Sequence, residues 1–306
     1  IGDLKTVSAR ALDAGVDMDM VSEGFLKTLK QSLAEGKITQ AQIDRACRRI
    51  LEAKYKLGLF SDPYRFCNED RASKELFSVQ NRTIARETAD ECQVLLKNDK
   101  NLLPLKKGGN IAVIGPLGDA SDDMPGCWAI TGKGGQSVSL YQGIKAALGS
   151  NGSVKYAKGS DLVADSVLET KLNGMMGFVI PGMKVKKVHD RKPEELLKEA
   201  LDIAAGSDVI IAALGENANM NGEGASRSIP DIPDPQKELL KALVSSGKPV
   251  VLVLFTGRPL ILTWENEHVP AILNAWFPGS EAGTSIAGIL FGDVNPSGRL
   301  TTTFPR

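Results

Sequence analysis

The segment best suited to chemistry is residues 216–228, a polar stretch rich in asparagine and glycine that follows an apolar run. Glu223 stands between two glycines, so no bulky neighbour shields its carboxyl group and its backbone can adopt unusual angles. A carboxyl group in this setting can donate or accept a proton. Arg227 is close enough in sequence to orient a carboxylate or a substrate hydroxyl, and Glu216 is a candidate pocket residue or a structural hydrogen-bonding group. The pattern alone favours a solvated polar loop over a functional one.

The elements that must position this loop become clear from residue 110 onwards. Short apolar or β-branched runs that finish at a glycine alternate with helical segments. The runs are 111–115, 154–159, 209–215, 250–257 and 271–279, and the helical segments are 139–148, 194–205, 235–246 and 281–291. This alternation predicts an α/β fold with a mainly parallel sheet covered by helices on both faces, an α/β/α sandwich. Ligands meet such sheets at the carboxyl ends of the strands, where the candidate loop begins.

One segment departs from this rhythm. Residues 161–192 are predicted to be an insertion, in which Met175, Met176 and Met183 serve as packing groups.

The first hundred residues have a different character. Residues 3–57 are predicted to be mostly helical, with Thr39 and Gln42 at the spacing of a capping box and Gly58 placed to end the helix. A polar connector over 61–80, a helix over 79–92 and an extended segment over 94–98 follow. We therefore expect three parts, which are residues 1–60, 61–108 and 109–306.

Composition excludes several classes of protein. Lys+Arg and Asp+Glu number 37 each, and no basic cluster is interleaved with aromatics, so a nucleic-acid partner is not expected. The longest apolar run, 250–255, is too short for a membrane span. The four cysteines lie far apart and the two histidines are not paired by spacing, so we predict neither a metal nor another cofactor. Because Ile1 is not preceded by a start or signal segment, we expect an internal cut in a longer protein.

Several motifs, in order, resemble glycoside hydrolase family 3. The segment Gly-Glu-Gly-Ala-Ser-Arg at 222–227 is similar to the acid/base loop of that family. Residues 14–20 resemble the last strand of its catalytic (β/α)8-type barrel, and residues 48–60 resemble the helix that closes the barrel. Further similar segments are the interdomain entry at 94–105, the start of the second domain at 114–117, and the motifs at 257–259, 276–279 and 291–300. The match covers nearly the whole chain, except residues 161–192.

The resemblance implies part of a retaining, exo-acting β-glycosidase, first of all a β-glucosidase, that acts by double displacement. Glu223 would be its general acid/base. The nucleophilic aspartate of the family follows a hydrophobic strand and precedes an aromatic residue, and none of the Ser-Asp pairs at 61–62, 121–122, 160–161 and 207–208 has this setting. We therefore expect the nucleophile upstream of Ile1 and no activity from this chain alone. The implied partners are a β-linked oligosaccharide or glucoside and the missing N-terminal barrel domain. The implied location is periplasmic or secreted.

The same resemblance places Trp128 near the leaving-group side, where stacking on sugar and plain packing are equally good interpretations. A β-xylosidase of the family remains open. An N-acetylglucosaminidase is disfavoured, because members of that kind typically take their acid from a barrel histidine. A non-catalytic α/β ligand-binding module is the alternative from another class. Helices at 22–57 are expected to leave an apolar face exposed, which favours aggregation or a homodimer.

Overall fold

The computed structural model describes residues 2–129, 135–173 and 188–306. The three methionines predicted as packing groups lie outside these ranges. The chain divides into two compact units, Ile1–Leu76 and Phe77–Arg306. None of the helices in the described ranges is long and apolar enough to cross a membrane.

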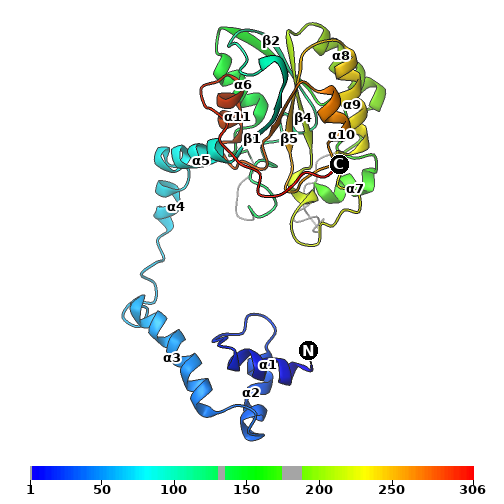
Figure 1. The fold of residues 1–306 in the computed structure, drawn as a ribbon. Helices are drawn as coiled ribbons and strands as arrows, with labels where there is room; N and C mark the ends of the chain where they lie inside the picture. Colours follow the sequence, from blue (N-terminus) through cyan, green and yellow to red (C-terminus); the bar gives the residue numbers. More distant parts are fainter. Residues whose placement is uncertain (1, 130–134, 174–187) are drawn as a thin grey trace. The chain divides into compact units, whose positions relative to one another are not determined.

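The second unit is built around a six-stranded sheet with the order β1-β6-β5-β4-β2-β3 (Figure 1). Strands β2 to β6 run parallel to one another, whereas β1 pairs antiparallel with β6. The strands are β1 (Val94–Asn98), β2 (Gly109–Ile114), β3 (Gly152–Ala157), β4 (Val209–Gly215), β5 (Val250–Phe255) and β6 (Ala271–Asn274). Each of the five predicted apolar runs overlaps a strand, and the predicted α/β fold with a mainly parallel sheet is confirmed.

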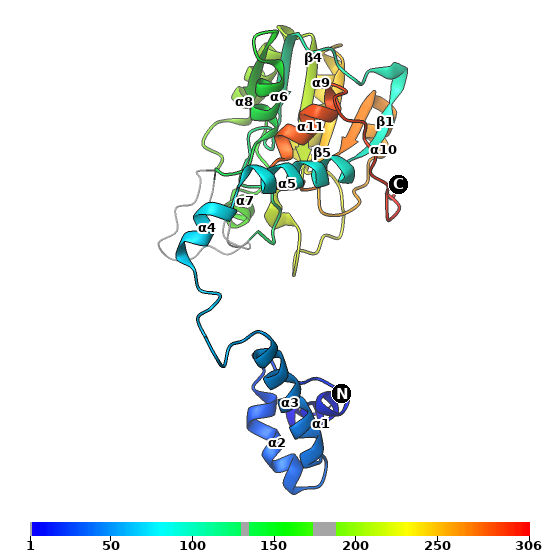
Figure 2. The same cartoon turned by 90° about the vertical axis from the view of Figure 1, so that its left-hand side faces the viewer.

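Helices cover both faces of this sheet. On one face lie α5 (Val79–Cys92), α6 (Leu140–Leu148) and α11 (Ala282–Leu290), and Figures 1 and 2 show α5 beside α11. On the other face lie α8 (Pro193–Ala205), α9 (Asp234–Ser245) and α10 (Thr263–His268). A short helix α7 (Ser166–Leu172) and the single turns η1 (Asp99–Asn101) and η2 (Ala218–Met220) complete the unit.

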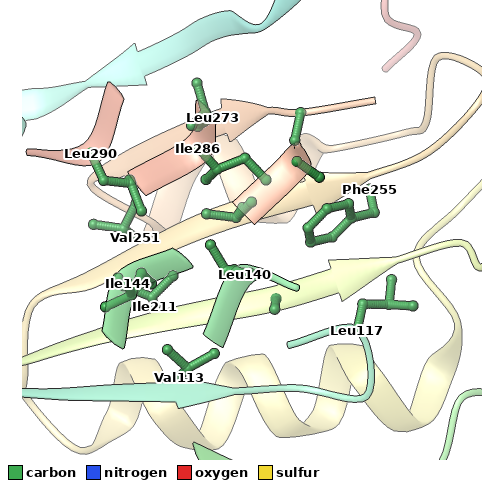
Figure 3. Close-up of a cluster of buried hydrophobic side chains, with 14 of the residues drawn as sticks. Val113, Leu117, Leu140, Ile144, Ile211, Val251, Phe255, Leu273, Ile286 and Leu290 are labelled. Atoms are coloured by element: carbon green, nitrogen blue, oxygen red, sulfur yellow. The ribbon is translucent and has the colours of Figure 1, made fainter. Parts of the chain in front are cut away.

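The core forms as two apolar layers because alternate strand residues face opposite sides. Ile211 contributes to the layer under α6 and α11, and its neighbour Ile210 contributes to the layer under α8 and α9. Figure 3 shows the first layer, in which strand residues such as Val113 and Val251 meet Ile144 and Leu290 from the helices. Strands β4 and β5 are buried along their whole length, as expected for central parallel strands.

Two helices on this face approach unusually closely through glycines. A methyl group added to Gly143 of α6 would lie 2.0 Å from the carbonyl oxygen of Gly283 in α11. No residue with a Cβ fits there without a shift of backbone, so glycine at these positions allows the two helices to pack.

The first unit is helical, with α1 (Leu4–Asp13), α2 (Gly24–Ala34), α3 (Gln40–Lys56) and the short α4 (Glu69–Glu75). The predicted capping box is confirmed, since Thr39 Oγ1 accepts from the Gln42 N–H at 3.3 Å and Gln42 Oε1 accepts from the Thr39 N–H at 2.7 Å. Its core is small, with Leu12, Ile38 and Ala46 as the buried apolar residues. Large apolar side chains are exposed, among them Met20, Leu26 and Tyr55.

The barrel strand expected at residues 14–20 is not formed. These residues have no strand hydrogen bonding, and no strand occurs in the described part of the first unit. A strand satisfies its N–H and C=O groups by pairing with neighbours, so an isolated barrel strand has no means of forming. Residues 77–108, expected to form part of a linker, contain α5 and β1, and β1 is part of the sheet.

Candidate active site

The candidate site is built at the carboxyl ends of β4 and β5. These strands run in parallel register, with Gly215 opposite Phe255, so the residues that follow them emerge side by side. Glu216 follows β4, and Thr256 and Arg258 follow β5. The polar segment 216–228 leaves the sheet at this edge, where open α/β sheets bind ligands.

Glu216 is the buried anchor of this edge. Its side chain has no exposed surface. One carboxylate oxygen accepts from Nη1 of Arg227 at 2.8 Å, and the other accepts from Oγ1 of Thr256 at 3.0 Å and from Nε of Arg258 at 3.3 Å. A buried carboxylate is tolerated when its charge is paired and its lone pairs are used, and both conditions are met here. Glu216 therefore holds other groups in place and is not open to a ligand in this structure.

Arg258 extends this network into the loop. Its Nη2 donates to the carbonyl oxygens of Met220 at 2.6 Å and Ala225 at 2.8 Å. Asn221 contributes from within the loop, since its Oδ1 accepts from the Gly257 N–H at 3.1 Å. The backbone is thus tied to the end of β5 on both sides of Glu223.

Glu223 itself is exposed and makes no hydrogen bond or ion pair with the residues that the structure describes. It lies between Gly222 (φ +92°) and Gly224 (φ +75°), and both glycines adopt the left-handed backbone that disfavours other residues. The carboxyl group is therefore presented at the tip of an anchored turn and is free to exchange a proton with a ligand. The unusual backbone angles predicted on either side of Glu223 are found at both glycines.

Trp128 comes from a separate loop that lies against this turn. A methyl group added to Gly222 would be 2.7 Å from Sγ of Cys127 and 3.7 Å from Cζ2 of Trp128. The indole is 61% exposed, so most of it remains available for contact. Arg227, in contrast, bonds to Glu216, and no bond joins it to Glu223. The structure therefore brings Trp128 near the Glu223 turn and places Arg227 in the supporting network.

Several residues of the network were not assigned a role from sequence. For Arg258, at the end of an apolar run, the sequence favoured a structural role, and Thr256 and Asn221 were not singled out. Asn217, buried at the start of the loop, donates from Nδ2 to the carbonyl of Leu172 at 3.1 Å and accepts from the Met220 N–H. The signal available was that these polar residues lie within a few positions after β4 or β5, at the edge where ligands bind.

A second cluster of polar groups lies elsewhere in the same unit. Asp161, Glu169 and His189 each offer a ligand atom, and these atoms lie within 4.8 Å of one another, which the sequence spacing did not indicate. Nζ of Lys158 lies 2.6 Å from Oδ1 of Asp161 and 4.0 Å from Oε1 of Glu169. Two carboxylates and an imidazole are ligands that suit a metal ion, but the Lys158 ammonium already neutralises part of the negative charge of the two carboxylates.

Two further carboxyl groups of the second unit, those of Glu265 and Glu281, have raised pKa values. Burial raises the pKa of Glu265, and the nearby carboxylate of Asp231 raises it further. Burial also raises the pKa of Glu281, while its ion pair with Arg82 at 2.8 Å acts in the opposite direction. Neither group is bonded to Glu216 or Arg258, which support the Glu223 turn, so we assign both a structural role.

The pattern of the glycosyl hydrolase family 3 C-terminal domain matches residues 93–306. The chain therefore belongs to glycosyl hydrolase family 3.

Similar proteins agree with this assignment. A "Periplasmic beta-glucosidase" of Salmonella typhimurium is 42% identical over 299 residues, which are 97% of this chain and 38% of that protein. A "Beta-xylosidase" of Formosa agariphila is 35% identical over 311 residues, which are 96% of this chain and 39% of that protein. The solved β-glucosidase of Listeria innocua in complex with isofagomine has a TM-score of 0.81 at 32% identity, covering 99% of this chain and 38% of that one. The chain thus spans about two fifths of the length of the relatives it matches.

Proposed function

We propose that this chain supplies the general acid/base, Glu223, of a retaining exo-acting β-glycosidase, and that this enzyme is a β-glucosidase. The observation that carries the proposal is the exposed carboxyl group of Glu223 on a turn tied to the carboxyl ends of β4 and β5. Membership of family 3 and the similarity to proteins named β-glucosidases support the same activity.

The chemistry requires two carboxyl groups about 5–5.5 Å apart across the scissile bond. In the first step a nucleophilic aspartate attacks the anomeric carbon while protonated Glu223 gives its proton to the departing glycosidic oxygen. In the second step the Glu223 carboxylate takes a proton from water, whose oxygen displaces the aspartate from the anomeric carbon. Glu223 thereby returns to its protonated form, and the sugar leaves with its β configuration retained.

The aspartate is proposed to belong to the N-terminal barrel domain of the family, which would also hold the sugar. Residues 1–60 would be the C-terminal part of that barrel, residues 61–108 the connection, and residues 109–306 the sandwich that carries the acid/base loop. The exposed apolar side chains of the first unit support this division, because a barrel would provide surfaces that cover them. Association into a homodimer is the second way to cover them.

Two further residues are assigned supporting parts. The exposed indole of Trp128, beside the Glu223 turn, offers an apolar face on which the leaving group can stack. Arg227 is placed to contact substrate hydroxyls with the guanidinium hydrogens that Glu216 does not use, since its side chain keeps 21% of its surface exposed. By analogy with the Salmonella relative, we propose a periplasmic location.

A β-xylosidase is the second candidate, since the relative from Formosa agariphila carries that name. The two candidates differ in the substituent at C5 of the sugar. Comparing kcat/KM for p-nitrophenyl β-glucoside and β-xyloside on the polypeptide that joins this chain to its barrel decides between them. A higher value for the glucoside supports the proposal, and a higher value for the xyloside replaces it with the second candidate.

The role of Glu223 is tested by leaving-group dependence on the same polypeptide. Glu223→Gln should lower kcat/KM for a methyl glycoside by about 10²–10⁴-fold, the usual contribution of a general acid. It should change kcat/KM little for a 2,4-dinitrophenyl glycoside, whose leaving group needs no proton. Glu238→Gln, which alters an exposed glutamate of α9, is the matched control. Equal losses on both substrates would remove Glu223 from this role.

A further inference from the structure

We propose that Arg258 is a positioning residue that fixes the catalytic carboxyl group of Glu223 by bonding to the loop on either side of it. The inference rests on the proposed function of Glu223. It adds a residue that would touch no substrate and would act through the backbone of the acid/base turn.

The donor geometry of Arg258 carries the inference. Nη2 of an arginine has two hydrogens, and here they are directed to two carbonyl groups, those of Met220 and Ala225. These two carbonyls bracket residues 221–224, the turn that holds Glu223. One planar guanidinium therefore sets the separation of the two ends of the turn.

The guanidinium is in turn fixed from the sheet. Its Nε lies 3.3 Å from Oε2 of Glu216 and 3.4 Å from Oδ1 of Asn221. Glu216 is fully buried at the end of β4, and Arg258 follows the end of β5. The turn is thus held by two adjacent strands in the centre of the sheet, which are buried along their whole length.

Within the turn, the Ala225 N–H donates to the Gly222 carbonyl oxygen at 3.3 Å, and Arg258 adds support from outside the turn. The glycines on both sides of Glu223 give the backbone wide conformational freedom. Glu223 has no hydrogen bond or ion pair to any residue in the described ranges, so its side chain is not held directly. Proton transfer demands placement to within about 1 Å, and a misplacement of that size can cost about 10²-fold in rate. Release of the two carbonyls should therefore reduce acid/base catalysis specifically.

The experiment uses Arg258→Lys and Arg258→Met in the polypeptide that joins this chain to its barrel. Lysine keeps the charge but offers a compact ammonium that cannot reproduce the arginine fork. For both variants we expect kcat/KM for a methyl glycoside to fall by about 10²-fold, while kcat/KM for a 2,4-dinitrophenyl glycoside changes little. Azide, which replaces water without needing a base, should raise kcat for the 2,4-dinitrophenyl substrate.

Arg82→Met is the matched control, because it removes another arginine paired with a buried glutamate, Glu281, in the same unit. It should lower the melting temperature without any leaving-group dependence. Equal losses on both substrates for Arg258→Lys, or no loss on either, would overturn the inference. Failure of Glu223→Gln to show leaving-group dependence would instead reject the proposed function. A normal Glu223→Gln result with a null Arg258→Lys result would reject the positioning role alone.

Discussion

Glu216 and Arg258, which follow the neighbouring strands β4 and β5, meet with Nε of the arginine 3.3 Å from Oε2 of the buried glutamate. The pair joins the centre of the sheet to the loop that presents Glu223, since Arg258 also bonds to two carbonyls of that loop. This ion pair, together with the bonds of Arg227 to Glu216 and of the Gly257 N–H to Asn221, connects the loop that carries the exposed carboxyl group to the ends of β4 and β5.

Glu216→Gln should destabilise the chain by about 3 kcal/mol, because it leaves two arginines without their buried counter-charge. Urea denaturation at neutral pH measures this free energy. Glu238→Gln, in which an exposed ion pair with Lys241 is lost, is the control and should cost about 0.5 kcal/mol. Equal losses of unfolding free energy in the two variants would show that the ion pairs of Glu216 contribute no more to stability than the exposed pair of Glu238.

Gly222→Ala should destabilise the chain more than Gly224→Ala. Both glycines have positive φ, which costs alanine about 1 kcal/mol. Only at Gly222 would the added methyl group also approach Cys127 Sγ, to 2.7 Å, whereas nothing lies within 4 Å at Gly224. The extra crowding should add about 2 kcal/mol to the loss in unfolding free energy. A larger loss for Gly224→Ala would contradict the packing of the two loops.

The raised pKa of Glu265 predicts a pH dependence of stability. Its ordinary value is 4.5, and burial raises the folded-state value. The folded chain therefore binds more protons than the unfolded chain above pH 4.5, so this group's contribution to stability falls as pH rises through the interval between the two values. Glu265→Gln removes the dependence, so the stability of the variant relative to the wild type should increase from pH 4.5 upwards. A difference that stays constant with pH, measured by urea denaturation, would be inconsistent with a raised pKa of Glu265 in the folded chain.

The chain alone should not hydrolyse p-nitrophenyl β-glucoside, because the proposed nucleophile is not among its residues. Turnover would be measured with purified chain at high concentration, with Glu223→Gln in the same chain as the control for contaminating enzyme. Hydrolysis that disappears in the variant would show that the nucleophile lies within these residues.

Sequence patterns were sufficient for most of the fold. The runs that form the central strands β4 and β5 were recognisable because their apolar residues are buried on both faces of the sheet, a signal that is local in the sequence. The capping box at Thr39 is equally local. The strand expected at 14–20 was wrong because a strand depends on hydrogen-bonding partners, and none is present in the described part of that unit.

The supporting network of the site was harder to predict than the loop itself. Glu223 was predicted because its loop at 222–227 resembles the acid/base loop of family 3, a likeness visible in a single segment, whereas its flanking glycines and its place after a strand fitted a solvated loop as well. The pairing of Glu216 with Arg258 joins residues 42 positions apart and arises from the register of β4 with β5. The grouping of Asp161 and Glu169 with His189 depends in the same way on how the chain folds back, which spacing does not reveal.

The most direct test of the role of Glu223 is the anomeric configuration of the product formed when azide reacts with the Glu223→Ala variant of the barrel-containing polypeptide. If Glu223 is the general acid/base, the aspartate still forms the glycosyl intermediate from a 2,4-dinitrophenyl β-glucoside. Azide then attacks that intermediate, and nuclear magnetic resonance should detect β-glucosyl azide together with a faster turnover. Formation of α-glucosyl azide, or no acceleration by azide, would contradict the account.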